Sequence, residues 1–271
     1  MSETPETSVD LSDAELLDQT ATAVRAAGSA LHQRFGGVVP YTNFDDLMRA
    51  LAANDDAVLD ILRPRLARLR PQAGWVGDEL DGGALPPGEW WVVDPAEGNV
   101  NHLHALHDWA VTATLVRENK PVLAVVHLPL TGETYSALAG AGAHVDGRPL
   151  SVSATADLGL SIVATSQARP DEDDDVVRRI GSSITAMLFD ALVVRTSVPA
   201  TLHLANVAAG RLDAFWQFAG ARADLLPGAL LVTEAGGRIT DAQGNPWSPH
   251  SESFLATAPG VHAEAVATLS R

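Results

Sequence analysis

Two carboxylates follow a short apolar run in the segment WWVVDPAEGNVN. Asp94 directly follows Trp90–Val93, and Glu97 stands three positions further on, between Pro95 and Gly98 of a turn. Hard divalent cations such as Mg²⁺ take oxygen ligands and usually keep water and substrate phosphate as further ligands. The spacing therefore predicts a cation site, and the alternative is that Asp-Pro and Glu-Gly serve only as turn-forming pairs.

Further acidic residues stand at predicted element ends elsewhere. Asp78 and Glu79 follow the apolar run Trp75-Val76, which predicts a second buried strand that ends in carboxylates. Asp224 opens the helical segment DLLPGALLVTEAGG, with Asp224 expected as its N-cap and a left-handed glycine at its C-terminus. Taken alone, each pattern fits an ordinary strand end or helix cap as well as a metal ligand.

Two long helices are expected to precede these strands. Apolar residues recur at helical spacing over 13–35, and two glycines then end the segment. A second helix is expected over 44–69, with Pro64 bending or ending it. The start of the chain is thus predicted to be helical.

Strands and helices follow in two different patterns. Strands are expected over 110–116 and 122–127, with a hairpin near 134–138, so the first half is predicted to be α+β. From about Ser151 onward, strand-like SIVATS and ALVVRTS alternate with helical HLANVAAGRL and DLLPGALLVTEAG. That alternation is typical of a layered α/β unit.

The composition restricts the possible chemistry and partners. The chain has 271 residues, 46% of them hydrophobic, and no cysteine, so it can bury a large core but has no disulfide or thiolate site. Its formal net charge of -16 disfavours nucleic acid and anionic membranes as partners. The polar, acidic first residues and the lack of an apolar run of about 18 residues predict a cytoplasmic protein.

Five segments over about 75–245 resemble those of one known family in order and spacing. They are VGDEL, DPAEGNVN, PLTGETYSALAGAGAHVDGRPLSVS, VAAGRLDAFW and ADLLPGALLVTEAGGRITDAQG. In these segments the chain resembles the inositol monophosphatase family of metal-dependent sugar phosphatases. The resemblance implies a mixed α+β and α/β fold, a layered αβαβα sandwich, with an N-terminal half over 1–148 and a C-terminal half over 149–271. It also implies a homodimer.

The resemblance further implies the residues of an active site. A cation, Mg²⁺ or another divalent ion, would be held by four carboxylates: Asp78, Asp94, Glu97 and Asp224. The residues implied in catalysis are Asp78, Asp94, Glu97 and Asn99. Those implied in binding a small phosphorylated substrate are Gly98, Asn99, His104, Arg195 and Gln217. The Gly98 and Asn99 amides would hold the phosphate at the N-terminus of the following helix.

Several positions depart from the family pattern. Glu97 and Asn99 replace the second Asp and the Thr of the family motif D-P-x-D-G-T-x-N. Asn99 has no hydroxyl with which to relay a proton. In the family's N-terminal motif D-L-V-T-x-x-D, Asp46 aligns with the first Asp, but Arg49 stands for the Thr and Ala52 for the last Asp. These changes predict a cation site that is weakened or absent.

The substrate region and the segment NHLHALHD also depart from the family. Val198-Pro199 replaces a Gly-(Ser/Thr) pair, Gln217 replaces a Glu and Ala223 replaces a Trp, which disfavours a plain inositol phosphate as substrate. Three histidines lie beside the predicted site, at positions 102, 104 and 107. They are expected to act in packing or capping, or alternatively as a general acid or base or as transition-metal ligands.

Two functions compete at this stage. The first is a Mg²⁺-dependent phosphomonoesterase acting on a small phosphorylated polyol, sugar or nucleotide. The second is a homologue that keeps the fold but catalyses a non-phosphatase reaction on a small metabolite, since fold alone does not fix function. A regulatory interaction protein is a third possibility, but the sequence offers no basic patch or apolar docking stripe to support it.

Overall fold

The computed structural model describes residues 11–76, 84–167, 172–218 and 222–271. Its helices are α1 (Asp13–Arg34), α2 (Phe44–Leu69), α3 (Asn99–Leu103), α4 (Asp174–Asp190), α5 (Ala200–Ala208), α6 (Arg222–Glu234) and α7 (His262–Leu269). The first strands are β1 (Gly74–Trp75), β2 (Glu89–Glu97), β3 (Ala110–Arg117), β4 (Lys120–His127), β5 (Thr134–Leu138), β6 (Gly142–Val145) and β7 (Arg148–Pro149). The later strands are β8 (Ile162–Thr165), β9 (Val193–Thr196), β10 (Ala214–Phe218), β11 (Arg238–Thr240) and β12 (Ser253–Thr257).

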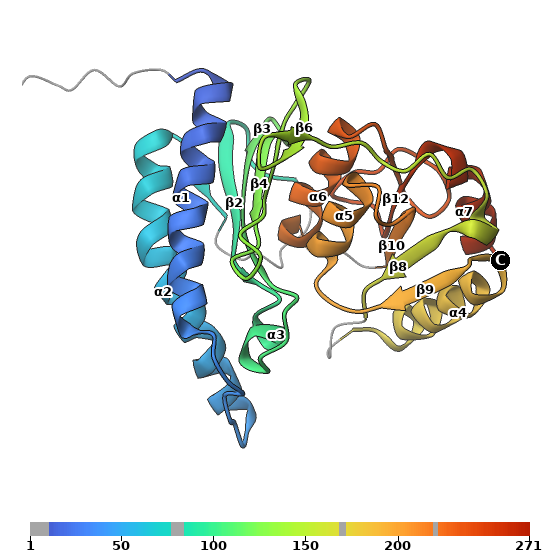
Figure 1. The fold of residues 1–271 in the computed structure, drawn as a ribbon, viewed down its shortest axis with the longest axis horizontal. Helices are drawn as coiled ribbons and strands as arrows, with labels where there is room; N and C mark the ends of the chain where they lie inside the picture. Colours follow the sequence, from blue (N-terminus) through green and yellow to red (C-terminus); the bar gives the residue numbers. More distant parts are fainter. Residues whose placement is uncertain (1–10, 77–83, 168–171, 219–221) are drawn as a thin grey trace, which may run out of the picture.

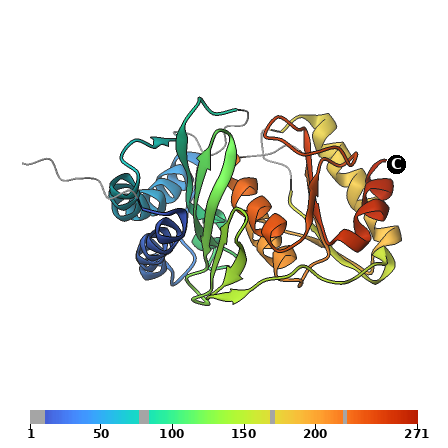
Figure 2. The same cartoon turned by 90° about the horizontal axis from the view of Figure 1, so that it is seen from above.

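The elements stack in five layers, as Figure 1 shows from the side and Figure 2 from above. Helices α1 and α2 cover one face of the first sheet, and α5 and α6 lie between that sheet and the second. Helices α4 and α7 cover the outer face of the second sheet. The predicted layered αβαβα sandwich is thus confirmed.

The two sheets differ in the direction of their strands. The seven-stranded sheet runs β1-β2-β3-β4-β5-β6-β7, and all its pairs are antiparallel except β1 with β2. The five-stranded sheet runs β11-β12-β10-β8-β9, with β9 on an edge and parallel to β8. The α+β and α/β patterns of the two halves of the sequence therefore correspond to two different sheets.

Both predicted N-terminal helices form. Ser12 caps α1 in a reciprocal capping box with Glu15, and buried Leu16, Val24 and Leu31 direct one face of the helix toward the first sheet. Pro64 lies inside α2, which continues to Leu69, so Pro64 does not end this helix.

The central layer depends on close packing between α5 and α6. A Cβ atom on Gly228 of α6 would lie 2.3 Å from the Cβ of Leu204 on α5, so only glycine permits this approach. Side chains of both helices share one core with the inner faces of the two sheets. Because α5 and α6 are fixed in this layer, the side chains of their first turns are held against the end of β2.

No helix in the described part of the chain is both long and apolar enough to cross a bilayer.

Candidate metal centre

A β-bulge at the end of β2 brings two carboxylates to the same side of the strand. Asp94 pairs with Thr112 of β3, while Glu97 pairs with Ala110, so β2 has one residue more than its partner between these two pairs. Residues three apart on a regular strand point to opposite faces. The extra residue reverses that alternation, and Asp94 and Glu97 both reach the same cluster.

Asp224 completes a group of three carboxylates. One oxygen from each of Asp94, Glu97 and Asp224 lies within 4.8 Å of the other two. Asp94 is 8% exposed and Glu97 is 2% exposed. Asp224 lies in the first turn of α6, which begins at Arg222. An N-cap residue precedes the first helical residue, so the prediction that Asp224 is the N-cap is wrong.

The cluster fits a hard divalent cation. Three carboxylates so close together, two of them buried, repel one another unless positive charge or protons offset them. The donor set consists of oxygen atoms only, which is the set preferred by Mg²⁺ and Mn²⁺. Asp78, the predicted fourth ligand, and the adjacent Glu79 lie outside the described residues.

Asp94 and Glu97 are each held by neighbouring groups. The Asp94 carboxylate accepts a hydrogen bond from the Ala96 amide over 2.9 Å, within the bulge itself. Oε2 of Glu97 lies 3.0 Å from the hydroxyl oxygen of Thr201, a fully buried residue in the first turn of α5. The cluster is therefore connected to α5 as well as to β2 and α6.

Both ends of the Asn99 side-chain amide are hydrogen-bonded to residues of α2. Its Nδ2 donates to the Asp55 carboxylate over 2.9 Å and to the Leu51 carbonyl over 3.1 Å, and its Oδ1 accepts from Asn54 over 2.8 Å. Asn54, 1% exposed, also accepts a hydrogen bond from Arg34 and donates to His102. This network attaches the turn after Glu97 to the second helix.

The carboxylate that α2 brings to this turn belongs to Asp55. The predicted alignment placed Ala52 at the last Asp of the family motif, but the residue of α2 whose carboxylate contacts Asn99 is Asp55. Asp46 lies in the first turn of α2 and contacts Thr42, Asn43 and Arg49. Burial raises the pKa of the Asp55 carboxyl to about 6, against the opposing effect of the hydrogen bond from Asn99.

The three clustered histidines make different contacts, although the rings of His102 and His107 both pack against Phe35. His102 is 2% exposed; its Nδ1 accepts from Asn54 and its Nε2 lies 3.0 Å from the Leu31 carbonyl, to which it donates. Desolvation lowers the pKa of His102, so the ring is neutral and structural. His104 pairs with Tyr41 over 2.8 Å, and the His107 ring packs against Phe35. Among the described residues, the group able to hold an ion contains no histidine.

Gly98 has a left-handed conformation that its surroundings require. Its φ is 80°, and a Cβ there would lie 2.5 Å from the Asp108 carbonyl oxygen. The Nδ2 of Asn101 donates to that same carbonyl and to the Val198 carbonyl. The turn is thus joined to the segment that precedes α5. The helix that follows Gly98, α3, has five residues.

The remaining predicted substrate residues lie on the second sheet. Gln217 on β10 accepts a hydrogen bond from Ser166 over 2.8 Å. Arg195 on β9 is exposed and lines a cavity of about 280 Å³. The walls of that cavity include Asp108, Val198, Pro199, His203 and Arg211.

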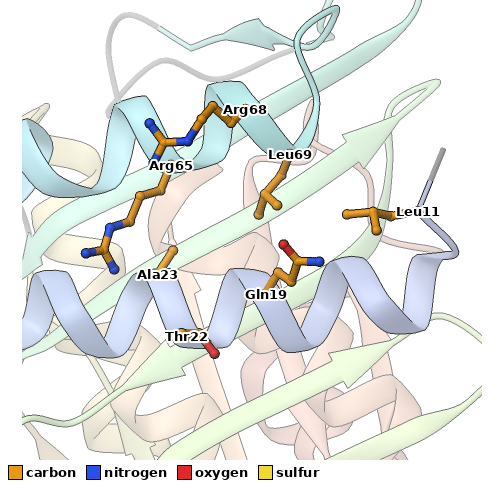
Figure 3. A pocket seen from close by; sticks show the side chains of 7 residues that line it. All are labelled: Leu11, Gln19, Thr22, Ala23, Arg65, Arg68 and Leu69. Atoms are coloured by element: carbon orange, nitrogen blue, oxygen red, sulfur yellow. The ribbon is translucent and has the colours of Figure 1, made fainter. Parts of the chain in front are cut away.

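A larger cavity, about 600 Å³, lies between α1 and α2, and none of the predicted site residues lines it. Figure 3 shows Leu11, Gln19, Thr22 and Ala23 from the beginning of the chain opposite Arg65, Arg68 and Leu69 at the end of α2. Asn54 and Asp55, which contact the site, lie in the other half of that helix. The volume of a cavity therefore does not identify the site in this protein.

Residues 13–271 match the model of the inositol monophosphatase family. The chain belongs to this family. It is 33% identical over 237 residues to an inositol-1-monophosphatase of Rhizobium meliloti, covering 84% of this chain and 86% of that protein. It is 30% identical over 234 residues to the Nus factor SuhB of Pseudomonas aeruginosa, covering 85% and 86%.

The fold agrees with solved structures of the same family. The extragenic suppressor protein suhB of Bartonella henselae superposes with a TM-score of 0.80 at 25% identity, covering 94% of this chain and 99% of that one. Membership of the inositol monophosphatase family supports a phosphatase, and the family is metal-dependent. The acidic cluster of Asp94, Glu97 and Asp224 is a candidate site for such a metal.

Proposed function

We propose that the protein is a Mg²⁺-dependent phosphomonoesterase that acts on a small phosphorylated polyol, sugar or nucleotide. The observation that carries the proposal is the approach of Asp94, Glu97 and Asp224 to within 4.8 Å of one another. These carboxylates would hold the cation, and Asp78 is proposed as a fourth ligand. A bound cation supplies a Lewis acid that activates water and neutralises charge on the leaving oxygen.

The chain's own groups would bind and orient the ester. The Gly98 and Asn99 amides are proposed to bind phosphate, since the left-handed Gly98 leaves them at the start of α3. Arg195, Gln217 and His104 are proposed to contact the rest of the substrate. Arg195 brings positive charge to a chain whose net charge is -16, which supports its role beside an anionic ester.

Release of inorganic phosphate tests the proposal. The protein is incubated with a panel of sugar, inositol and nucleotide monophosphates, with Mg²⁺ or with EDTA. We expect Mg²⁺-dependent turnover of at least one ester and loss of that turnover in Asp94→Asn. The control is Asp18→Asn, an exposed position on α1. Turnover that persists in EDTA, or in Asp94→Asn, would overturn the proposal.

A second candidate is a non-phosphatase reaction on a small metabolite. The observation that favours it is Asn99, which has no hydroxyl and whose amide is bonded to Asn54, Asp55 and Leu51. Such a side chain cannot pass a proton to or from a water molecule. If no ester in the panel releases phosphate while Mg²⁺ still raises the melting temperature, this second function is preferred.

We also propose that the protein is a homodimer in the cytoplasm. Support for the dimer comes from apolar side chains exposed beside the edge strand β9, namely Leu188, Phe189, Leu192 and Val193. Exposed apolar groups next to an unpaired strand edge are typical of a surface that another chain covers. The cytoplasmic location stays a prediction from the sequence.

A further inference from the structure

Thr201 touches both elements that carry the acidic cluster, β2 with Asp94 and Glu97 and α6 with Asp224. It lies in the first turn of α5 and its side chain is fully buried. Its hydroxyl oxygen is 3.0 Å from Oε2 of Glu97 at the end of β2 and 2.7 Å from the backbone carbonyl oxygen of Asp224 in α6. One hydroxyl group therefore lies between a carboxylate of the cluster and the backbone of another member.

Glu97 needs such a contact more than an aspartate would. A glutamate has one more rotatable bond than an aspartate, so its carboxylate is less defined by the backbone and loses more freedom when fixed. At 2% exposure, Glu97 has little water to satisfy its oxygens. A buried hydroxyl on a helix held between two sheets provides a rigid hydrogen-bond partner for it.

The contact to Asp224 acts on the backbone. The carbonyl oxygen of Asp224 is near the start of α6, where the direction of the first turn decides where the carboxylate of the same residue points. The single hydroxyl proton of Thr201 is shared between this carbonyl and Oε2 of Glu97, which both accept, so the hydroxyl links the turn to α5 and to Glu97. Thr201 thus contributes to the separation of the two carboxylates.

We propose that Thr201 is a positioning residue of the cation site, which sets the place of Glu97 and Asp224 without contacting the ion. The proposal rests on the proposed function, because it assumes that the acidic cluster binds a divalent cation. Groups that orient metal ligands in this way usually change metal affinity by about 10- to 100-fold when they are removed.

Binding of Mn²⁺, measured by titration calorimetry in the absence of any substrate, tests the inference. Thr201→Val keeps the shape of the side chain but removes the hydroxyl, and we expect it to weaken Mn²⁺ binding by about 10-fold or more. Thr201→Ser keeps the hydroxyl, and we expect it to restore most of the affinity. Thr201→Ala is a second variant without the hydroxyl, in case Thr201→Val does not fold.

The matched control is Thr114→Val. Thr114 is 1% exposed on β3, and its hydroxyl has no hydrogen-bond partner within the described residues. Its replacement removes a buried hydroxyl of the same kind, yet we expect Mn²⁺ affinity to stay within about twofold of the unaltered protein, because the lost group orients no ligand.

A double-mutant cycle separates positioning from general damage. Glu97→Asp shortens this side chain by one methylene and moves the carboxylate away from Thr201, so Thr201→Val is expected to add little further loss in that variant. Equal Mn²⁺ affinity of the unaltered protein and Thr201→Val, or failure of Thr201→Ser to restore binding, would overturn the inference. An unaltered protein that binds no Mn²⁺ would instead overturn the proposed function.

Discussion

Asp55 and Asn99 are joined by a hydrogen bond of 2.9 Å, although they lie on different elements and 44 positions apart in the chain. The bond connects the second helix to the turn that follows Glu97. Asp55 is partly buried there, and its burial raises the pKa of its carboxyl to about 6. The site thus includes an ionisable group outside the three-carboxylate cluster, and its charge changes near neutral pH.

The raised pKa of Asp55 gives a stability that depends on pH. The folded value, about 6, exceeds the ordinary value of 3.8, so the folded protein holds this proton more tightly than the unfolded chain does. The stabilisation that the Asp55 carboxyl contributes is fully present below pH 3.8 and is lost as the pH rises to about 6. Asp55→Asn is therefore expected to be more stable than the unaltered protein at pH 7.5, and the gain should disappear near pH 4.

Urea unfolding in EDTA at the two pH values measures this effect. Because Asp55 is partly exposed and solvent screens its charge, we expect a gain of about 1–2 kcal/mol at pH 7.5. Asp60→Asn, at an exposed position on the same helix, is the control and should give no comparable gain. An Asp55→Asn protein that gains the same stability at both pH values would show that ionisation of Asp55 is not the cause.

Asn54 is the central residue of the polar network behind the turn. Its side chain bonds to Arg34, Asn99 and His102, and it is 1% exposed. Asn54→Ala leaves His102 buried without this partner, while half-buried Asn99 and exposed Arg34 can bond to water instead. Because an unpaired buried polar group costs about 1–3 kcal/mol, we expect the free energy of unfolding to fall by about that amount.

Asn54→Asp distinguishes the roles of the two ends of this side chain. A carboxylate still accepts from Arg34 but cannot donate to Asn99 or His102. Its loss of stability should therefore lie close to that of Asn54→Ala at pH 7. If Asn54→Asp is as stable as the unaltered protein, the bonds to Asn99 and His102 contribute nothing measurable.

Gly98 and Gly132 form a matched pair for testing the turn. Their φ angles are 80° and 78°, but a Cβ on Gly98 meets the Asp108 carbonyl at 2.5 Å, while one on Gly132 meets nothing within 4 Å. Both alanine substitutions carry the cost of a left-handed backbone, about 1 kcal/mol. Gly98→Ala should cost a further 1–3 kcal/mol or so, because the backbone must move. Equal losses in thermal or urea unfolding would contradict the close contact.

Much of the fold could be predicted from the sequence because its signals are local. The spacing of apolar residues gives α1 and α2, and short apolar runs between turn residues give β2, β3 and β4. The segment TEAGG correctly predicts the end of α6, where Gly236 has a φ of 86°. Pro64 was the weaker signal, since packing against the first sheet lets α2 continue past it.

The candidate site was harder to predict because it depends on contacts between distant elements. The motif DPAEGN indicated Asp94 and Glu97, but not the bulge that turns both to one side. Asp55 was missed because no residue of α2 matches the family motif closely enough to fix the alignment. Positions 52 and 55 are about one helical turn apart, and only the hydrogen bond to Asn99 shows that Asp55 is the one that faces the site. Thr201 carried no signal of its own, since its role depends on where α5 lies.

The exposed apolar surface beside β9 gives a prediction about assembly. Phe189 at the end of α4 is 84% exposed and Leu188 is 63% exposed, next to a strand whose outer edge is unpaired within the described residues. If a second copy covers this surface, Phe189→Glu places a charge in an apolar interface and should convert a dimer to a monomer. Light scattering coupled to size-exclusion chromatography measures the mass directly.

The control is Val38→Glu, at a 64% exposed position in the segment before α2, which should leave the mass unchanged. A dimer that persists in Phe189→Glu would place the interface elsewhere, and a monomeric unaltered protein would rule out the homodimer.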